Sequence, residues 1–139
     1  MTFAATAGFD ELYGLRITAV GEAKVRGEVV VRAELLGPSG AVHEGVLTAT
    51  AAALSRIGTE RAVASAGDVA RILSAEVSLA RPVAEGTVHA VALARHRGRT
   101  TWAWEVELRD DADDLVALAR VGVAVQRPSA QVPAQPRLA

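Results

Sequence analysis

The sequence predicts an α+β domain in which an antiparallel β-sheet wraps around one central α-helix. Between residues 46 and 57, apolar and small residues point in nearly every direction around a 3.6-residue period. A helix that is apolar all round is expected to be buried all round. Much of the remaining chain alternates between apolar and polar residues, the pattern of half-buried strands. In a chain of 139 residues, a surrounding sheet is the simplest way to bury such a helix.

Length and composition predict a single domain over residues 1–126, followed by a flexible tail over residues 127–139 that holds three of the five prolines. The net charge of −1 lacks the basic footprint of a nucleic-acid-binding protein. The chain has no cysteine, and its three histidines do not show metal-ligand spacing, so we expect no metal and no cofactor. We expect no membrane association and a cytoplasmic location, because no apolar run approaches ~18 residues.

The predicted elements follow one another in a simple order. A helical turn over residues 9–13 should cover one end of the core and end at Gly14, and strands at 15–20 and 24–33 should form a hairpin. A turn over residues 37–40 leads into the helix, which should end near Gly58 because glycine commonly follows a helix C-terminus. Further strands are predicted at 72–80, 86–95, 100–109 and 115–125. The strand at 86–95 is semi-apolar on both faces, which is typical of a strand at a subunit interface.

Three segments in order resemble the hotdog-fold thioesterases of the PaaI type. They are GPSGAVHEG, with Pro38, Gly40, His43 and Gly45 in register with the family's N-P-x-G-x-x-H-G-G; SAEVSLARPVAEGTVHA; and the closing strand pair with its Gly-Arg turn. The similarity spans residues 9–126. It implies the hotdog fold, hydrolysis of an acyl thioester of coenzyme A or of an acyl carrier protein, and a homodimer or homotetramer.

The resemblance places the chemistry at the N-terminus of the central helix. Backbone N–H groups there have no partner within the helix, and the helix dipole adds partial positive charge. The Gly45 N–H would polarise the thioester carbonyl as its oxygen gains negative charge, with His43 supporting the loop. A carboxylate would then act as the base for water or as the nucleophile.

This chain departs from the family pattern at the carboxylate. The family's Asp or Glu lies nine residues after the motif histidine, where this sequence has Ala52. Glu44, at a position that is normally Gly, is the most plausible replacement base. Its alternative role is an acidic residue in the first helical turn, stabilising the helix by a few tenths to about 1 kcal/mol. A protein that binds acyl thioesters without hydrolysing them is therefore the second hypothesis.

Further residues are assigned to substrate binding. Ala52, Ser55 and Arg56 occupy the helix where the family places polar site residues. The turn Arg97-Gly98-Arg99 is where the family has a Gly-Arg turn, and its arginines could hold the phosphates of coenzyme A. Glu76 is a second candidate base if its strand face meets the helix, and without function if that face meets water. Trp102 and Trp104 are expected to anchor the core or an interface.

Overall fold

The computed structural model describes residues 6–128, so the predicted tail lies outside the described residues except for its first two positions. The central helix is α2 (Glu44–Val63). The strands are β1 (Arg16–Gly21), β2 (Lys24–Val30), β3 (Val69–Leu79), β4 (Thr87–Arg97), β5 (Thr101–Arg109) and β6 (Leu115–Gln126); the short helices are α1 (Phe9–Leu12) and the 3-10 turns η1 (Ala33–Leu35) and η2 (Ala64–Ala66).

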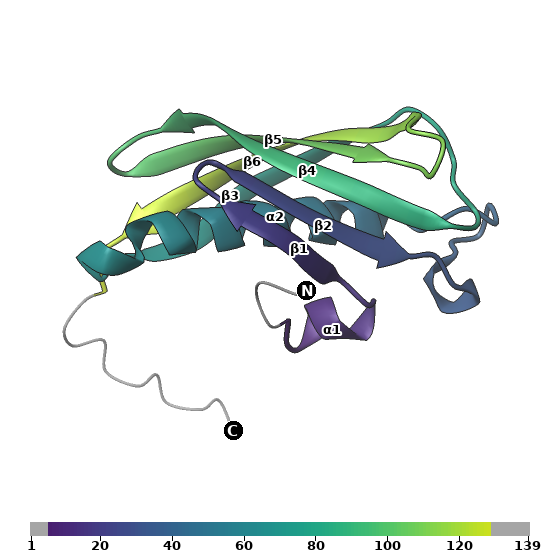
Figure 1. Cartoon of the computed structure of the whole chain (residues 1–139), viewed down its shortest axis with the longest axis horizontal. Coiled ribbons are helices and arrows are strands. Elements are labelled where there is room, and N and C mark those ends of the chain that lie inside the picture. Colours follow the sequence, from purple (N-terminus) through teal and green to yellow (C-terminus); the bar gives the residue numbers. More distant parts are fainter. Residues whose placement is uncertain (1–5, 129–139) are drawn as a thin grey trace, which may run out of the picture.

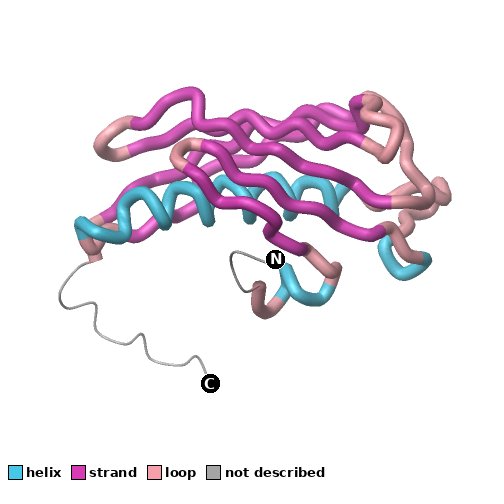
Figure 2. Tube along the Cα trace, in the orientation of Figure 1, coloured by secondary structure: helices cyan, strands magenta, loops and turns pink. Residues whose placement is uncertain are grey.

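The six strands form one sheet in the order β1-β2-β4-β5-β6-β3, and neighbouring strands are antiparallel. The sheet curves around α2, which lies against its concave face (Figures 1 and 2). The predicted fold, an antiparallel sheet wrapped around one central helix, is therefore confirmed. The chain enters the helix from the end where β2 finishes and β4 begins.

The core lies between the concave face of the sheet and one side of α2. Side chains alternate along the strands, so that one set faces the helix: Val25 and Val29 on β2, Val88, Ala90 and Ala92 on β4, and Trp102, Trp104, Val106 and Leu108 on β5 are all buried. The predicted inward face of β5 is thus confirmed, including the assignment of both tryptophans to the core. Small residues on the helix let the large rings of the sheet approach it closely.

One side of α2 remains partly open within a single chain. Leu47, Thr50, Ala51 and Leu54 face the sheet and are buried, whereas Ala49, Ala52, Arg56 and Glu60 are only half-buried. These four recur at three- and four-residue intervals and so share one face of the helix. The expectation that one chain would bury the helix all round is wrong, because the sheet covers it from one side only.

The helix also runs beyond the predicted end at Gly58. Gly58 is buried in the helix interior, and a Cβ built on it would lie 2.4 Å from Cη2 of Trp104. This glycine therefore permits close packing of helix against sheet instead of ending the helix. The left-handed residue after the helix is Gly67, which has a φ of 75° and follows η2. Strand β3 then starts at Val69, earlier than predicted.

The first helical turn forms as predicted, but only part of it covers the core. Tyr13 is buried, whereas Phe9 and Leu12 expose 65% and 71% of their surface. Gly14 follows with a φ of 82°, as expected for a residue that ends a turn. Two apolar side chains are thus left on the surface close to the start of β1.

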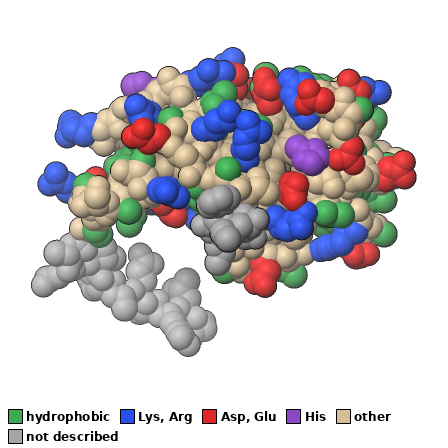
Figure 3. Space-filling view, viewed as in Figure 1, with side chains coloured by type: hydrophobic (Ala, Val, Ile, Leu, Met, Phe, Trp, Pro, Cys, Tyr) green, Lys and Arg blue, Asp and Glu red, His purple; other side chains and the backbone are tan. Residues whose placement is uncertain are grey.

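The convex face of the sheet carries charged side chains of both signs, among them Arg26 of β2, Glu105 of β5 and Arg120 of β6. Figure 3 shows acidic and basic side chains interspersed over the visible side of the molecule. On β4, Val91 and Leu93 are half-buried on this outer face, between exposed polar neighbours. The two-sided apolar character predicted for this strand is therefore present in the fold. Within residues 6–128, no helix is long and apolar enough to cross a membrane.

Candidate functional site

The N-terminus of α2 is held by a histidine cap. His43 has extended backbone angles, and its Nδ1 accepts a hydrogen bond of 2.9 Å from the Gly45 N–H. Its carbonyl accepts from the Val46 N–H, and its own N–H donates to the Leu35 carbonyl. Since Nδ1 accepts a hydrogen bond, the ring proton of a neutral imidazole lies on Nε2. The predicted supporting role of His43 is consistent with this geometry.

The histidine cap occupies the Gly45 N–H, the donor that the sequence analysis expected to bind the carbonyl oxygen of the substrate. Gly45 N–H points at the imidazole, and a Cβ at Gly45 would lie 2.9 Å from Nδ1, so glycine is what lets the ring sit here. The preceding amide differs, because the Glu44 N–H has no acceptor within residues 6–128. The first turn of α2 thus presents one occupied and one open backbone donor.

The Glu44 side chain lies at the same end of the helix. Its carboxylate is exposed, and Oε1 is 4.0 Å from His43 Nε2. The Thr48 hydroxyl donates to the Glu44 backbone carbonyl 3.0 Å away. Among residues 6–128, the Glu44 carboxylate itself accepts no hydrogen bond from a backbone N–H. A carboxylate, an imidazole N–H and an open backbone amide therefore meet within two consecutive residues, His43 and Glu44.

A larger hollow of about 520 Å³ opens on one side of this terminus. His43 and Gly45 lie in its wall together with Val46, and the remaining wall comes from the segments that flank the hairpin of β1 and β2. Those lining residues are Phe9, Leu12, Tyr13, Arg32, Glu34, Leu35 and Leu36. The wall is mainly apolar, and the exposed Phe9 and Leu12 belong to it, so this hollow fits an apolar group.

A smaller hollow of about 230 Å³ lies on the other side, where Glu44 and Leu47 of α2 meet the ends of β3 and β6. Apolar residues dominate here too, including Leu79, Val83 and Val116. Arg81 stands in its wall and pairs with Asp114 at 2.6 Å. The helix terminus thus separates two hollows, with Gly45 facing one and Glu44 facing the other.

The predicted helix residues lie further along α2. Ala52 is half-buried on the open face of the helix. Ser55 is fully buried, and its hydroxyl donates to the Ala51 carbonyl 2.8 Å away. Arg56 is half-buried and pairs with Asp10 of α1 at 3.2 Å and with Glu60 at 3.4 Å. Within one chain, Ser55 and Arg56 are engaged by protein groups and only Ala52 faces open space.

The turn Arg97-Gly98-Arg99 lies at the other end of the molecule. It joins β4 to β5. Trp104, near the start of β5, packs against Gly58 near the C-terminal end of α2, so the turn lies at that end of the helix. A helix of 20 residues is about 30 Å long. Arg97 places its guanidinium 5.9 Å from the centre of the Trp102 ring. One chain therefore does not bring this turn to the helix N-terminus.

Two other sequence candidates occupy the outer surface. Glu76 is exposed on the convex face of β3, so the interpretation that its face meets water holds for one chain. Within the described part of the chain, no three His, Asp or Glu side chains group closely enough to hold a metal ion. His89 instead pairs with Asp111 at 2.8 Å, beside the loop between β5 and β6.

Two polar residues near the site were missed by the sequence analysis. Glu34 of η1 lines the larger hollow with His43 and pairs with Arg32 at 3.6 Å. Tyr13 lines it too, and its hydroxyl donates to Asp10 at 3.1 Å. Burial, together with the Asp10 carboxylate, raises the pKa of Tyr13, which keeps it a neutral donor. Neither residue lies in a recognisable motif, since only the fold brings them beside the helix.

A sequence-family comparison identifies residues 40–117 as matching the thioesterase superfamily. The chain is also 30% identical over 118 residues to a Mycobacterium tuberculosis protein named "Putative esterase Rv1847", covering 84% of each chain. It is 26% identical over 120 residues to the 1,4-dihydroxy-2-naphthoyl-CoA hydrolase of Listeria monocytogenes, covering 86% of this chain and 97% of that one.

Solved structures show the same architecture. The structure of the mycobacterial protein Rv1847 superposes with a TM-score of 0.84 at 29% identity, covering 87% of this chain and 98% of that one. The PaaI protein of Escherichia coli, from the phenylacetic acid degradation operon, superposes with a TM-score of 0.75 at 24% identity, covering 86% and 83%. The second likeness concerns the fold alone, and both agree with the antiparallel sheet and central helix described above.

Proposed function

The chain belongs to the thioesterase superfamily, and from this membership and the geometry of α2 we propose that it hydrolyses acyl thioesters of coenzyme A or of an acyl carrier protein. The observation that carries the proposal is the exposed amide end of α2, which lies between two mainly apolar hollows with a carboxylate beside it. Hydrolysis of a thioester needs a donor for the carbonyl oxygen and a base for water, and both types of group are present here.

The proposed reaction begins with the carbonyl oxygen at the first turn of α2. The Glu44 N–H can donate to this oxygen without rearrangement, whereas the Gly45 N–H, the donor expected from the sequence, must first leave His43 Nδ1. Water attacks the carbonyl carbon and gives its proton to the Glu44 carboxylate, while the helix terminus stabilises the negative oxygen. The carbon–sulfur bond then breaks, the carboxylic acid forms, and the sulfur takes the proton back from Glu44 and leaves as the free thiol, which regenerates the Glu44 carboxylate.

The two hollows give the two ends of a thioester different places. We assign the acyl group to the larger hollow because its wall includes Phe9, Leu12 and Leu35, which offer apolar area. The thiol arm would leave past Glu44 through the smaller hollow, towards Arg81. The Listeria relative is named for an aromatic acyl thioester of coenzyme A, and a similar aromatic acyl group is our proposed substrate class.

A second copy of the chain is part of this proposal. Strand β3 is an edge strand of 11 residues that exposes Val69, Leu73 and Leu79, and such edges pair readily with another strand. Antiparallel pairing of two β3 edges would also cover the open face of α2. It would bring Arg97 and Arg99 of the partner subunit to the end of the molecule where α2 begins, which reconciles their predicted phosphate role with their distance from Gly45 in one chain.

The test is a panel of acyl-coenzyme A thioesters assayed by release of free thiol. Glu44→Gln should abolish turnover with little change in KM, because the amide keeps the shape of the side chain but cannot accept the proton. Glu22→Gln, an exposed carboxylate in the turn between β1 and β2, is the matched control and should retain full activity. Unchanged turnover in Glu44→Gln would exclude Glu44 as the base and direct the search to Glu34. A monomer by light scattering would contradict the shared site.

A non-catalytic thioester-binding protein is the second candidate, and the position of Ala52 favours it. Ala52 lies on the open face of α2, where a longer acidic side chain would have room, yet it has no ionisable group. This alternative predicts saturable binding of acyl-coenzyme A with negligible turnover. Ala52→Glu combined with Glu44→Gly should then produce measurable hydrolysis. A folded but inert double variant would contradict the loss of a base at this position.

A further inference from the structure

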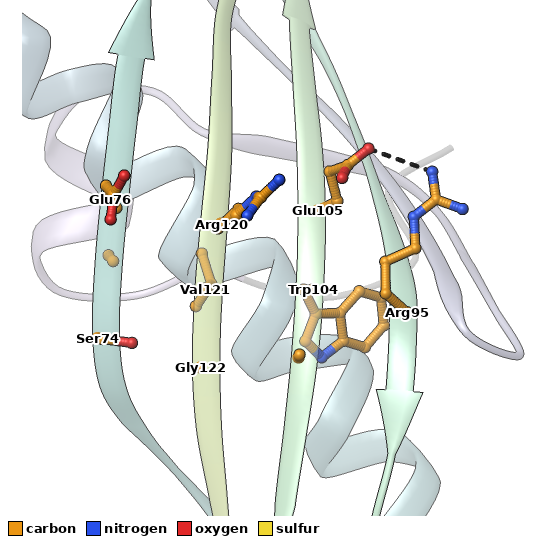
Figure 4. Close-up of a pocket in the computed structure, with 10 residues that line it drawn as sticks. Ser74, Glu76, Arg95, Trp104, Glu105, Arg120, Val121 and Gly122 are labelled. Atoms are coloured by element: carbon orange, nitrogen blue, oxygen red, sulfur yellow. Dashed lines mark hydrogen bonds and ion pairs between the residues drawn. The ribbon is translucent and has the colours of Figure 1, made fainter.

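The short helix α1 is tied to the middle of α2 by an ion pair between residues 46 positions apart in the sequence. Arg56 Nη2 donates to Asp10 Oδ2 at 3.2 Å. Elsewhere, ion pairs join neighbouring strands, such as Arg95 and Glu105, which pair at 3.2 Å across β4 and β5 on the convex face (Figure 4). Within residues 6–128, the pair of Arg56 and Asp10 is the one ion pair that connects two helices.

Asp10 is held from several sides. Its Oδ1 accepts a hydrogen bond of 3.1 Å from the Tyr13 hydroxyl, and its backbone carbonyl accepts one of 3.0 Å from the Leu15 N–H. The Asp10 side chain exposes 20% of its surface, so the ion pair with Arg56 is partly shielded from water. Because Tyr13 is buried, the Asp10 carboxylate lies between the core on one side and the guanidinium of Arg56 on the other.

The guanidinium of Arg56 is divided between two carboxylates. Its Nη1 lies 3.4 Å from the carboxylate of Glu60, one turn further along α2. One turn earlier stands Ala52, whose methyl group leaves the open face of the helix clear beside Arg56. A guanidinium has five N–H donors in a fixed plane, so it can bind Asp10 and Glu60 at the same time. Arg56 thus connects the helix surface to α1.

Helix α1 forms the outer wall of the larger hollow. Phe9 and Leu12 line this hollow, although they expose 65% and 71% of their surface. The Phe9 ring leans on Tyr13, with ring centroids 5.3 Å apart. Arg32 donates to the Leu12 carbonyl and so ties the other end of α1 to the segment after β2. Polar contacts, more than burial of its own side chains, therefore hold α1 at the hollow.

We propose that Arg56 and Asp10 determine the specificity for the acyl group by holding α1 against it, a role that rests on the proposed binding of an acyl thioester at α2. A helix of four residues has almost no stability of its own, so α1 loses its fixed place when the pair is broken. A bulky apolar acyl group, such as an aromatic ring, then loses its contacts with Phe9 and Leu12. Arg56 is a positioning residue that acts through α1.

The binding of two non-hydrolysable thioethers, phenacyl-coenzyme A and acetonyl-coenzyme A, tests this role by calorimetry. In both compounds a CH₂ group separates the sulfur from the carbonyl, so there is no thioester bond to cleave. The first carries an aromatic ring in the acyl position, and the second carries only a methyl group. Arg56→Gln and Asp10→Asn should each raise the Kd of phenacyl-coenzyme A about two- to fivefold, the range for losing a partly exposed ion pair. The Kd of acetonyl-coenzyme A should not change.

Further variants separate the ion pair from general damage. Asp10→Asn keeps an acceptor for the Tyr13 hydroxyl, and Arg56→Lys keeps the positive charge and should recover most of the affinity. Because Asp10 and Arg56 act through one contact, the double variant should bind phenacyl-coenzyme A no more weakly than either single variant. Glu60→Gln is the matched control, since it removes the other partner of Arg56 and leaves Asp10 in place. It should bind both compounds as the wild type does.

Hydrogen exchange gives a second measurement that needs no ligand. The Leu12 and Leu15 amides donate within α1 and the turn that follows it, to the carbonyls of Gly8 and Asp10, and should exchange faster in Arg56→Gln and Asp10→Asn. An unchanged Kd of phenacyl-coenzyme A in both variants, or an equal loss for the two compounds, would overturn the proposed role of the pair. A wild type that binds neither compound would contradict the proposed function as well, whereas binding that the variants leave unaltered contradicts the role of the pair alone.

Discussion

Each end of α2 contains a glycine, but the N-terminal end of the helix is exposed and the C-terminal end is buried. At the N-terminal end, Glu44 and Gly45 are exposed, and hollows lie on both sides of the helix. At the C-terminal end, Gly58 and Thr59 are buried against Trp104. The indole N–H donates to the Thr59 hydroxyl at 2.8 Å, and that hydroxyl donates to the Ser55 carbonyl at 2.9 Å.

The C-terminal end of α2 therefore contributes to stability, whereas the N-terminal end offers the groups proposed for the reaction. The C-terminal half has every polar group of Thr59 and Trp104 satisfied by its neighbours, so it fixes the position of the helix against the sheet. The N-terminal end keeps an open backbone donor and an exposed carboxylate, which a buried and fully paired helix end would not offer. We therefore expect mutations at the two ends to affect different measurements.

The largest expected effect is at the buried end. Gly58→Ala should lower the free energy of unfolding by about 1–3 kcal/mol, because the added methyl would lie 2.4 Å from Cη2 of the Trp104 ring and force helix and sheet apart. The change is measured by urea denaturation followed by tryptophan fluorescence. Gly45→Ala is the matched control at the open end, where the methyl meets only the His43 imidazole and should disturb the cap and activity more than global stability. Equal stability of Gly58→Ala and wild type would show that the ring can move aside.

A smaller effect is expected from the cap at the open end. His43→Ala removes the acceptor of the Gly45 N–H and should cost about 1 kcal/mol of stability, the usual value for losing an N-cap side chain. His43→Asn supplies another good capping side chain and should recover most of the loss. Thermal unfolding of the three proteins checks this order. If His43→Asn is as unstable as His43→Ala, the histidine contributes through packing against Gly37 and not through capping.

The smallest expected effect is on the pH dependence of stability, through Asp111 in the loop between β5 and β6. This loop packs beside the start of β4. A hydrogen bond from His89 and another from the Thr87 N–H hold the pKa of Asp111 below its ordinary value. A depressed pKa contributes stability above the unfolded-state pKa of 3.8, and this contribution is lost as the pH falls through the folded-state value. The unfolding midpoint of the wild type should therefore fall more steeply below about pH 4 than that of Asp111→Asn. Parallel curves for the two proteins would contradict this contribution.

Local sequence patterns were sufficient for the strands and for the placement of the helix start. The alternation in β5 put Trp102, Trp104, Val106 and Leu108 on one face, because side chains in a strand alternate regardless of what they contact. His43 was recognised at the loop before the helix because the Gly/Pro turn and the motif precede it directly. The same local reasoning failed at Gly58, where a glycine reads as a helix end unless the approach of Trp104 is known.

The sequence by itself determined the fold class, the order of its elements and the family, since each rests on patterns within short segments. The tertiary structure decided that His43 occupies the Gly45 amide and that Arg97 lies far from it within one chain. It also brought Glu34 and Tyr13 into the larger hollow. The physical reason is that hydrogen-bond occupancy, hollows and cross-strand neighbours depend on contacts between distant segments, which no local periodicity encodes.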